Sequence, residues 1–555
     1  MLVRSSRSSK TTMFTQEQGL YIAHCEKGPV SINPKMANRH GLVAGATGTG
    51  KTVTLQVLAE TFSQIGVPCF MADMKGDLSG ISQAGKMSGF IEKRLPEFGL
   101  NDPQFAPCPV RFYDVYGEQG HPMRATVSQM GPDMLGRILQ LNETQTGVLN
   151  IVFRVADDRN LMLLDLKDLR SMLDYVSNHG KEFTTKYGNV AATSVGAIQR
   201  ALLALENQGA EKFLGEPSFD INDLLAVENG RGVMSVLAAD KLMLQPKLYS
   251  TFLLWLMSEL YVTLPEVGDQ DKPKLVFFFD EAHMLFDGTS KAMVDKIEQV
   301  IRLIRSKGVG IYFVTQNPTD IPDTILGQLG NRVQHALRAF TPKDQKAVRT
   351  AADTFRPNPN FKTDEAITTL ETGEALVSVL DEAGAPTVVE KCKVLFPLSQ
   401  IGAITEGQRL DLIKSSAVYG KYDTPVDRES AFEVLLKESE DEEARRAAEK
   451  EALEREKADA KAAKEAEKEA AKAEKEAAKE AKKPGILAKV WKAIVTAVTA
   501  TFATIVGTYV TEKITGKKSK SKKSATEKIT KNATSAATRT ITREVSRSIL
   551  GNLVK

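Results

Sequence analysis

The order of hydrophobic and polar positions divides the chain into two parts. Up to about residue 435, apolar runs of strand length alternate with segments whose apolar residues recur at helical spacing. Uninterrupted apolar runs are typical of strands in a parallel sheet that helices cover on both faces. We therefore expect an α/β fold with a mainly parallel sheet. The predicted strands are Gly41–Gly45, Val67–Asp73, Gly232–Leu237, Lys274–Asp280, Gly310–Gln316, Val333–Phe340 and Glu374–Leu380.

A long stretch from Val127 to Leu225 interrupts this alternation. Its apolar residues keep a helical period, and polar segments at Asp157-Asp158 and Asn178–Gly180 separate successive helices. This pattern predicts a helical insertion within the α/β core. The predicted helices are Met130–Leu141, Thr144–Arg154, Leu166–Asn178 and Ala191–Ala204.

The second part begins with a segment, Lys437–Lys483, made almost wholly of Ala, Glu, Lys and Arg. These residues are strong helix formers, and many Glu and Lys lie three or four positions apart, where they support an exposed helix. A coiled coil is the alternative, but Leu453 is nearly alone as a large apolar residue, so no hydrophobic seam exists. A single charged helix or a disordered spacer is favoured.

Two further segments follow Pro484-Gly485. Ala493–Val510 carries no charge over 18 residues, which reaches the length of a membrane-spanning helix. Its five threonines favour an interfacial or partner-packing helix over a membrane span. The last segment, Ala537–Val554, is cationic and amphipathic, and we interpret it as a packing helix for another subunit.

These changes of pattern predict the domain organisation. The expected parts are a short N-terminal segment (1–30), the first part of the core (31–126), the helical insertion (127–225), the second part of the core (226–410), a connector (411–436), a charged helix or linker (437–483), a Thr-rich apolar segment (484–516) and a basic tail with an amphipathic helix (517–555).

Composition and charge narrow the class of protein. With 42% hydrophobic and 26% charged residues, the chain has the make-up of a soluble globular protein. The net charge of +3 hides an asymmetry, because residues 486–555 carry 14 Lys/Arg against 3 Asp/Glu. We expect this tail, rather than the acidic core, to meet phosphate or an anionic membrane.

Cysteine usage and the N-terminus bear on location. The four cysteines lie far apart in the sequence without a C-x-x-C pair, which argues against a zinc site or a disulfide framework and suits a reducing compartment. The polar, Ser-rich N-terminus has no apolar run typical of a secretory signal. We expect a cytoplasmic protein, with peripheral attachment to the inner membrane as the alternative.

The main chemical motif is Gly45-Ala-Thr-Gly-Thr-Gly-Lys51-Thr52, which lies between an apolar strand and a helical pattern. Glycines let backbone N–H groups point at a phosphate, and the helix N-terminus adds a favourable dipole. We expect Lys51 to reach the β- and γ-phosphates of ATP and the Thr52 hydroxyl to bind Mg²⁺. The predicted nucleotide-binding residues of this loop are Gly45, Ala46, Thr47, Gly48, Thr49, Gly50, Lys51, Thr52 and Val53.

A second motif, Asp280-Glu281, follows the apolar run Leu275–Phe279. A buried strand would deliver Asp280 beside the metal ion, and Glu281 would orient the attacking water. Together the two motifs predict a P-loop NTPase that hydrolyses ATP, since the chain has no Asn-Lys-x-Asp guanine signature. The spelling Asp-Glu-Ala-His at 280–283 matches one helicase class, but the other motifs of that class are missing, so we interpret it as coincidental.

Polar residues near the next strand complete the candidate site. Gln316 ends that strand, where its side chain could touch the γ-phosphate or the attacking water. Arg302 and Arg305 lie on the helix between the two strands, and an arginine there can project into a neighbouring subunit. A solvated helix face is the alternative for each arginine.

The motif set resembles the bacterial HerA-like ATPases of the YjgR type, in the HerA/FtsK superfamily. The similar segments are Gly45–Thr52, Asp73–Asp77, Leu141–Gln145, Leu164–Asp168, Asp280–His283, Thr315–Asp320, Asn331–Asp344, Thr354–Pro359, Gly373–Val377 and Arg539–Gly551.

The resemblance implies a RecA-like core that assembles as a homo-oligomeric ring, commonly a hexamer, with ATP bound between subunits. By analogy Arg305 matches a trans-acting arginine finger, Arg39 an arginine that contacts nucleotide at the subunit boundary, and Gln316 a residue that senses nucleotide. HerA proteins carry an N-terminal β-barrel that docks a nuclease. Only about 40 residues precede the loop here, so a nuclease partner is not expected.

Three functions fit these observations. The first is a ring ATPase that translocates or remodels double-stranded DNA. The second is a membrane-associated motor of the conjugation type, suggested by the uncharged segment Ala493–Val510. The third is a scaffold that uses nucleotide only for assembly, and Glu281 argues against it, because a scaffold needs no carboxylate to orient water.

Overall fold

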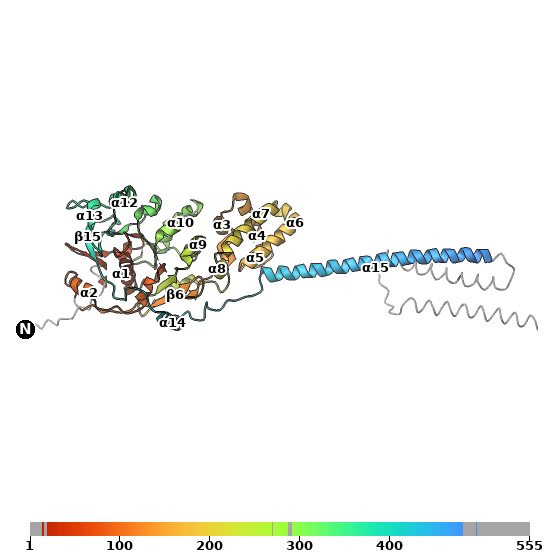
Figure 1. Cartoon of the computed structure of the whole chain (residues 1–555), viewed down its shortest axis with the longest axis horizontal. Coiled ribbons are helices and arrows are strands. Elements are labelled where there is room, and N and C mark those ends of the chain that lie inside the picture. Colours follow the sequence, from red (N-terminus) through yellow and green to blue (C-terminus); the bar gives the residue numbers. More distant parts are fainter. Residues whose placement is uncertain are drawn as a thin grey trace, which may run out of the picture. The chain divides into compact units, whose positions relative to one another are not determined.

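The computed structural model describes residues 14–15, 19–100, 102–268, 270–286, 291–480 and 496 (Figure 1). The chain forms two compact units, Met1–Leu436 and Lys437–Lys555. The first unit contains a large mixed sheet, and its mainly parallel part confirms the predicted α/β fold.

Eight adjacent strands form the parallel part of the sheet, in the order β13-β4-β12-β11-β5-β10-β6-β7. The strands are β4 (Gly41–Ala44), β5 (Cys69–Asp73), β6 (Val110–Asp114), β7 (His121–Pro122), β10 (Met234–Ala238), β11 (Leu275–Phe279), β12 (Val309–Thr315) and β13 (Asn331–Gln334). Nearly all of their residues are buried, which explains why they are continuous apolar runs in the sequence.

Antiparallel strands extend the sheet beyond β13, in the order β14-β15-β2-β1, with β3 also paired to β2. These strands are β1 (Phe14–Thr15), β2 (Gly19–Cys25), β3 (Gly28–Ile32), β14 (Glu374–Ser378) and β15 (Glu390–Val394). A separate two-stranded sheet joins β8 (Val227–Glu228) to β9 (Arg231–Gly232). Strands from both ends of the first unit therefore meet at one edge.

Helices cover both faces of the sheet. On β11, Phe277 and Phe279 pack into one hydrophobic cluster with α9 and α10, whereas Phe278 packs into another with α1. This follows from the alternation of side chains along a strand. The helices of the core are α1 (Lys51–Gln64), α2 (Gly89–Arg94), α9 (Pro246–Thr263), α10 (Lys291–Ile304), α11 (Asp323–Leu326), α12 (Pro342–Asp353), α13 (Thr363–Thr369) and α14 (Glu406–Ser415).

Successive helices fill the region between β7 and β8 (Figure 1). The predicted helix Leu166–Asn178 is confirmed with the same bounds, and the other three shift by a few residues. Two further helices, α6 and α8, were not predicted from the pattern. The helices are α3 (Val127–Ile138), α4 (Glu143–Asp158), α5 (Leu166–Asn178), α6 (Gly180–Tyr187), α7 (Ala192–Glu206) and α8 (Ala210–Phe213).

Short 3-10 turns connect several elements of the core. They are η1 (Pro34–Met36), η2 (Asp77–Ser82), η3 (Ile221–Leu225), η4 (Leu242–Leu244), η5 (Ala282–Leu285), η6 (Arg305–Lys307) and η7 (Pro318–Asp320). Two of these turns matter for the site, because η5 follows the strand that ends at Asp280-Glu281 and η6 contains Arg305.

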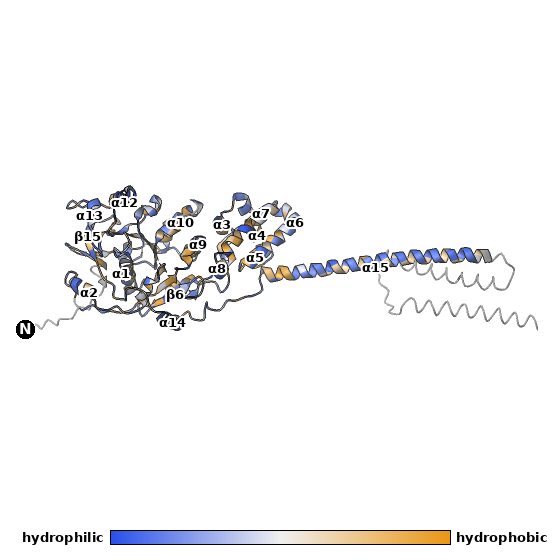
Figure 2. Cartoon of the chain, viewed as in Figure 1, coloured by the Kyte–Doolittle hydropathy of each residue, from blue (hydrophilic) through white to orange (hydrophobic). Residues whose placement is uncertain are grey.

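The second unit begins within one long helix, α15 (Ala431–Glu480), which confirms a helix over the described part of the charged segment. Figure 2 shows apolar residues at its start and mostly polar residues along the remainder. No helix in the described ranges has the length and apolar character of a membrane span. The predicted segments Ala493–Val510 and Ala537–Val554 lie outside the described residues, apart from Thr496.

The predicted strand Val333–Phe340 is wrong in its bounds, because β13 ends at Gln334. The following apolar residues, including Leu337, leave the sheet and pack in a small cluster with α12 and α13. These positions are apolar because they are buried in this cluster, although they do not belong to a strand. Strands β6 and β15 were not predicted, and β15 carries charged residues beside its buried residues Cys392 and Val394.

Candidate functional site

The candidate site lies where four parallel strands end at the same edge of the sheet. Strand β12 pairs with β4 so that Thr315 opposes Ala44, and β11 pairs with both β12 and β5. The loop at Gly45 follows β4, Asp280 follows β11 and Gln316 follows β12. Carboxyl ends of adjacent parallel strands are the usual place for ligands in such sheets. The sheet order therefore assembles residues that are far apart in the sequence.

The loop between β4 and α1 has the backbone of a phosphate cradle. Gly48 and Gly50 have φ angles of 80° and 109°, which residues with a Cβ rarely adopt. In the described part of the chain, no protein acceptor is recorded for the backbone N–H groups of residues 47–53. Since they form a loop and the first turn of a helix, these donors fit the oxygens of a polyphosphate.

The loop is tied to the sheet on both sides. Gly45 N donates to Thr315 O at 3.2 Å and Ala46 N donates to Ala336 O at 2.8 Å. The Lys51 ammonium donates to Ala46 O at 3.1 Å, so it curls over its own loop. Burial lowers the pKa of Lys51, and the nearby carboxylates of Glu281 and Asp280 act in the opposite direction. The position of Lys51 beside these carboxylates fits a group that binds phosphate charge.

Asp280 is buried, with 5% of its surface exposed. One carboxylate oxygen accepts from the Glu281 backbone N–H at 2.9 Å. Burial raises its pKa to about 6, and the neighbouring charge of Glu281 adds to this effect. A buried carboxylate with a raised pKa gains from a cation, and Mg²⁺ commonly takes one or two protein oxygens together with phosphates. These properties of Asp280 fit a cation ligand, and Thr52 stays the second predicted ligand.

Glu281 is held in a strained conformation by a small polar network. Its backbone is left-handed, with φ and ψ both 48°, a region that non-glycine residues occupy at a cost and that clusters at functional sites. The Lys75 ammonium donates to Glu281 Oε1 at 2.7 Å, and Gln316 Nε2 lies 3.2 Å from Oε2. His283 Nδ1 is 3.5 Å from Oε2.

These contacts set the charge of Glu281. Burial by itself would raise the pKa of Glu281, but the hydrogen bond and charge of Lys75, followed by Gln316 and His283, outweigh it and lower the pKa. The carboxylate thus stays ionised although only 5% of the residue is exposed. An ionised, oriented carboxylate at this place can accept a proton from, or orient, a water molecule.

The two arginines that the resemblance assigns to the site, Arg39 and Arg305, lie away from the loop at Gly45–Thr52 of their own chain. Arg39 precedes β4 and Arg305 precedes β12, so both lie at the amino ends of strands whose carboxyl ends form the site. Arg305 is near buried His40, since its charge helps to lower the pKa of that histidine to about 4, after the larger effect of burial. Within one chain the structure does not bring Arg39 or Arg305 to the loop.

His335 is a supporting residue that the sequence analysis did not single out. It is fully buried, its Nε2 lies 2.8 Å from Thr54 Oγ1, and its Nδ1 lies 2.9 Å from Glu374 O. Burial lowers its pKa to about 4, which keeps the ring neutral. It joins α1 to β13 and β14 directly beneath the loop.

Lys75 was quoted in the resemblance without a role, and Gly373 was quoted in the same way. Gly373 N donates to Thr49 O at 3.0 Å, so it supports the loop from the antiparallel side. Sequence reasoning missed both functions because the contacts join segments about 200 or more residues apart. The one available signal was their inclusion in shared motifs.

Comparison with known proteins fits this geometry. The profile of the family described as helicase HerA-like C-terminal matches residues 19–508. The chain belongs to this HerA-like family. The predicted resemblance is thereby confirmed, while the narrower YjgR-type assignment stays a prediction.

Curated proteins that match the chain have low sequence identity to it. The HerA-like chain is 22% identical over 370 residues to the DNA double-strand break repair helicase HerA of Sulfolobus acidocaldarius, covering 65% of this chain and 66% of that protein. It is 22% identical over 357 residues to the protein of the same name from Sulfurisphaera tokodaii, covering 63% and 64%. The chain thus spans just under two thirds of the length of these relatives.

Two solved structures show partial similarity to this chain. The bacterial conjugative coupling protein TrwB, in an unbound form, is 16% identical with a TM-score of 0.45 and covers 68% of this chain and 89% of that one. VirB4 of Thermoanaerobacter pseudethanolicus is 14% identical with a TM-score of 0.44 and covers 69% and 98%.

Proposed function

We propose that this HerA-like chain hydrolyses ATP with Mg²⁺ at the edge of its parallel sheet. The observation that carries the proposal is Glu281, an ionised carboxylate in a strained backbone that Lys75 and Gln316 orient beside a phosphate-binding loop. A protein that only bound nucleotide would have no use for such a group. Family membership supports the same conclusion.

Each residue of the site has its own role in the proposed reaction. The N–H groups of residues 47–53 and the Lys51 ammonium hold the β- and γ-phosphates. Thr52 and Asp280 would hold Mg²⁺, and the ion would supply positive charge against the charge that develops on the phosphates. Glu281 orients a water in line with the γ-phosphorus and polarises it, and Gln316 reports on the state of that phosphate through its contact with Glu281.

The active form is a homo-oligomeric ring, hexameric by analogy with the family. Arg39 and Arg305 lie at the opposite ends of the strands from their own chain's loop, so they can meet a nucleotide only when a neighbouring subunit presents them. A neighbour's Arg305 would offset the charge of the transition state, as arginine fingers do in trans.

Double-stranded DNA is the substrate on which this ring acts. The curated relatives are named as DNA double-strand break repair helicases. Residues 486–555, with 14 Lys/Arg against 3 Asp/Glu, offer a basic segment for the phosphate backbone. A nuclease partner is not part of the proposal. A membrane-associated motor remains the second candidate from the sequence, and its motivating segment Ala493–Val510 lies outside the described residues apart from Thr496.

The decisive experiment compares ATP turnover of the full-length chain with that of Glu281→Gln and Lys51→Ala, each with and without duplex DNA. We expect Glu281→Gln to bind ATP normally and to lose about 100-fold or more in turnover, the usual effect of removing such a group. Lys51→Ala should lose nucleotide binding itself.

Each arm of this experiment can fail separately. Undiminished turnover in Glu281→Gln would reject the assignment of that residue. If the protein hydrolysed ATP but did not bind duplex DNA and was not stimulated by it, the DNA substrate would be rejected and the ATPase assignment would stand.

A further inference from the structure

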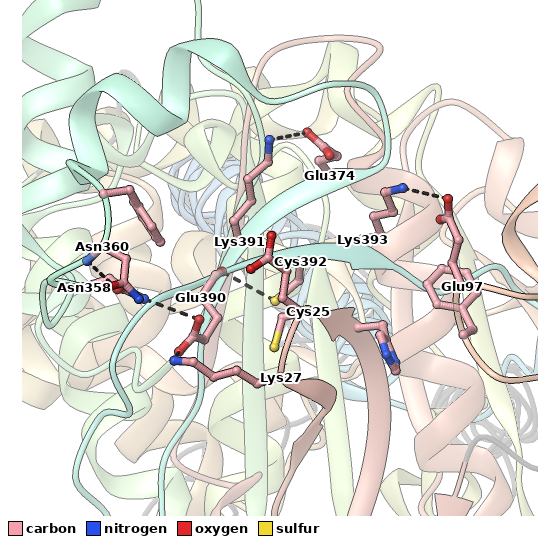
Figure 3. Close-up of a pocket in the computed structure, with 14 residues that line it drawn as sticks. Cys25, Lys27, Glu97, Asn358, Asn360, Glu374, Glu390, Lys391, Cys392 and Lys393 are labelled. Carbon is pink, nitrogen blue, oxygen red and sulfur yellow. Dashed lines mark hydrogen bonds and ion pairs between the residues drawn. The ribbon is translucent and has the colours of Figure 1, made fainter.

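A pair of thiols lies outside the nucleotide site, at the antiparallel end of the sheet. Cys25 ends β2 and Cys392 lies in β15, and the two residues oppose each other in the antiparallel register. Cys25 is 8% exposed and Cys392 is 2% exposed. Figure 3 shows the two sulfur atoms side by side at a cavity. Residues 367 positions apart in the sequence are thus direct neighbours.

The ladder places this pair where side chains approach most closely. Leu395 N donates to Ile22 O at 3.0 Å, which makes that pair hydrogen-bonded. Pairs alternate along an antiparallel ladder, so Lys393 and His24 form the next hydrogen-bonded pair, and Cys392 with Cys25 is a non-hydrogen-bonded pair. Such pairs have Cα atoms about 4.5 Å apart. A disulfide accepts Cα separations of about 4.4–6.8 Å, so one can form without moving the strands.

The two thiols differ in reactivity. Hydrogen bonding with Cys392 lowers the pKa of Cys25 to about 6 against the opposing effect of burial, and the backbone N–H groups of Lys27 and Gly28 in the β2–β3 turn add to the lowering. The Cys392 sulfur is 3.5 Å from Glu390 O, and its pKa is raised by the interaction with Cys25 and by burial. Cys25 is therefore the nucleophile and Cys392 the partner thiol.

A small oxidant has access to the pair. The cavity has a volume of about 620 Å³, and both cysteines line it. Ion pairs of Lys27 with Glu390, Lys391 with Glu374 and Lys393 with Glu97 surround it, as Figure 3 shows. A cavity of this size and polarity admits a small polar molecule such as hydrogen peroxide.

We propose that Cys25 and Cys392 are a modification site, at which a peroxide forms a reversible disulfide that straps β2 to β15. The Cys25 thiolate attacks one peroxide oxygen, the O–O bond breaks, and the leaving hydroxide takes up the proton that the thiol released, giving water and a sulfenic acid. The Cys392 sulfur then attacks the Cys25 sulfur, the S–O bond breaks, and the hydroxide leaves with the Cys392 proton as water. Two thiols and one peroxide thus give one disulfide and two waters.

The other two cysteines provide an internal comparison. Cys69 and Cys108 lie on either side of strand β10, because Met234 of that strand pairs with Cys69 on one side and with Val110 on the other. Burial raises the pKa of both thiols, that of Cys108 to about 12. They do not oppose each other in a strand pair, and neither thiol has the lowered pKa of Cys25. Although the sequence spacing argued against a disulfide framework, the sheet brings one pair together.

The test treats the full-length chain with hydrogen peroxide, alkylates the remaining thiols under denaturing conditions and maps the peptides by mass spectrometry. We expect two of the four thiols to become unavailable, a linked peptide pair containing Cys25 and Cys392, and full recovery with a dithiol reductant. Cys25→Ser should keep all three remaining thiols, whereas the matched variant Cys108→Ser should still form the link. Four free thiols in the treated wild type, or oxidation of Cys25 without the link, would overturn the proposal.

Thermal unfolding supplies a second readout. A disulfide that closes a loop of roughly 370 residues restricts the unfolded chain, so the oxidised protein should unfold at a higher temperature than the reduced protein. Cys392→Ser should show no such difference between treated and untreated samples. Equal unfolding temperatures of the linked and reduced wild type would contradict the strap.

Discussion

Several acidic residues at the site have pKa values that their surroundings shift away from the ordinary values. Burial raises the pKa of Asp280 to about 6 and that of Asp73, at the end of β5, to about 7, with the charge of Asp77 adding to the latter. The pKa of Glu281 is lowered instead, because the Lys75 ammonium contacts its carboxylate. Shifts of this kind gather where a fold places charge for chemistry rather than for stability.

Asp73 provides a test of this view through the pH dependence of folding. Because its pKa in the folded protein is raised from 3.8 to about 7, its contribution to stability is full below pH 4 and is lost as the pH rises through 7. Asp73→Asn should therefore stabilise the protein at pH 8, by up to about 4 kcal/mol, since each pKa unit is worth about 1.4 kcal/mol. At pH 4 the variant and the wild type should match. Thermal or denaturant unfolding at both pH values measures this, and an equal effect at both would exclude titration as the cause.

Lys75 provides a second test at this scale. Its ammonium lowers the pKa of Glu281, so Lys75→Ala should raise that pKa and move the acid limb of the pH profile for ATP turnover to higher pH. Lys75→Arg retains the charge and should leave the limb near its wild-type position. If Lys75 acted only on folding, both variants would lose turnover equally at all pH values, and the position of the limb would not move.

At the scale of elements, loops and helix ends fix how the insertion and the last core segment join. Asp168, in the first turn of α5, is fully buried and accepts from Leu164 N at 2.7 Å and from Phe432 N at 2.9 Å. Ser430 Oγ donates to the same carboxylate at 2.5 Å. One side chain therefore ties the start of α15 to the helical region.

Asp168→Ala should destabilise the protein by about 3 kcal/mol or more, because it leaves several buried donors without an acceptor. Asp174 on the same helix is exposed and bonds only to Gln199 in the described structure. Asp174→Ala is the matched control, with an expected change within about 0.5 kcal/mol. Urea unfolding of both variants measures the difference, and equal small effects would show that the Asp168 contacts do not stabilise the fold.

At the scale of the whole molecule, the roles proposed for Arg39 and Arg305 call for a second chain, because both residues lie away from the loop of their own chain. Both lie at the amino ends of their strands, whereas the loop of the same chain lies at the carboxyl ends. The proposed ring, in which each subunit supplies arginines to its neighbour, would satisfy this geometry.

Mixing inactive variants tests the shared site. Arg305→Ala and Lys51→Ala should each turn over ATP poorly alone, and co-assembled they should recover part of the activity, because some sites then combine an intact Lys51 with a neighbour's Arg305. A mixture of Lys51→Ala with Glu281→Gln is the matched control and should recover nothing, since both residues act within one chain. Absence of recovery in the first mixture, measured as ATP turnover against mixing ratio, would reject a trans role for Arg305.

Sequence patterns were enough to predict the loop at Gly45–Thr52, the Asp280-Glu281 pair, the buried parallel strands and the charged helix. Each depends on local pattern: apolar runs make buried strands, glycines permit a phosphate cradle, and Ala, Glu and Lys favour helix. Four features became visible only in the folded chain: Lys75 contacts Glu281, His335 supports the loop, Arg39 and Arg305 lie away from it, and Cys25 opposes Cys392. The reason is that sheet order and register bring together residues whose separation along the chain carries no record of their contact.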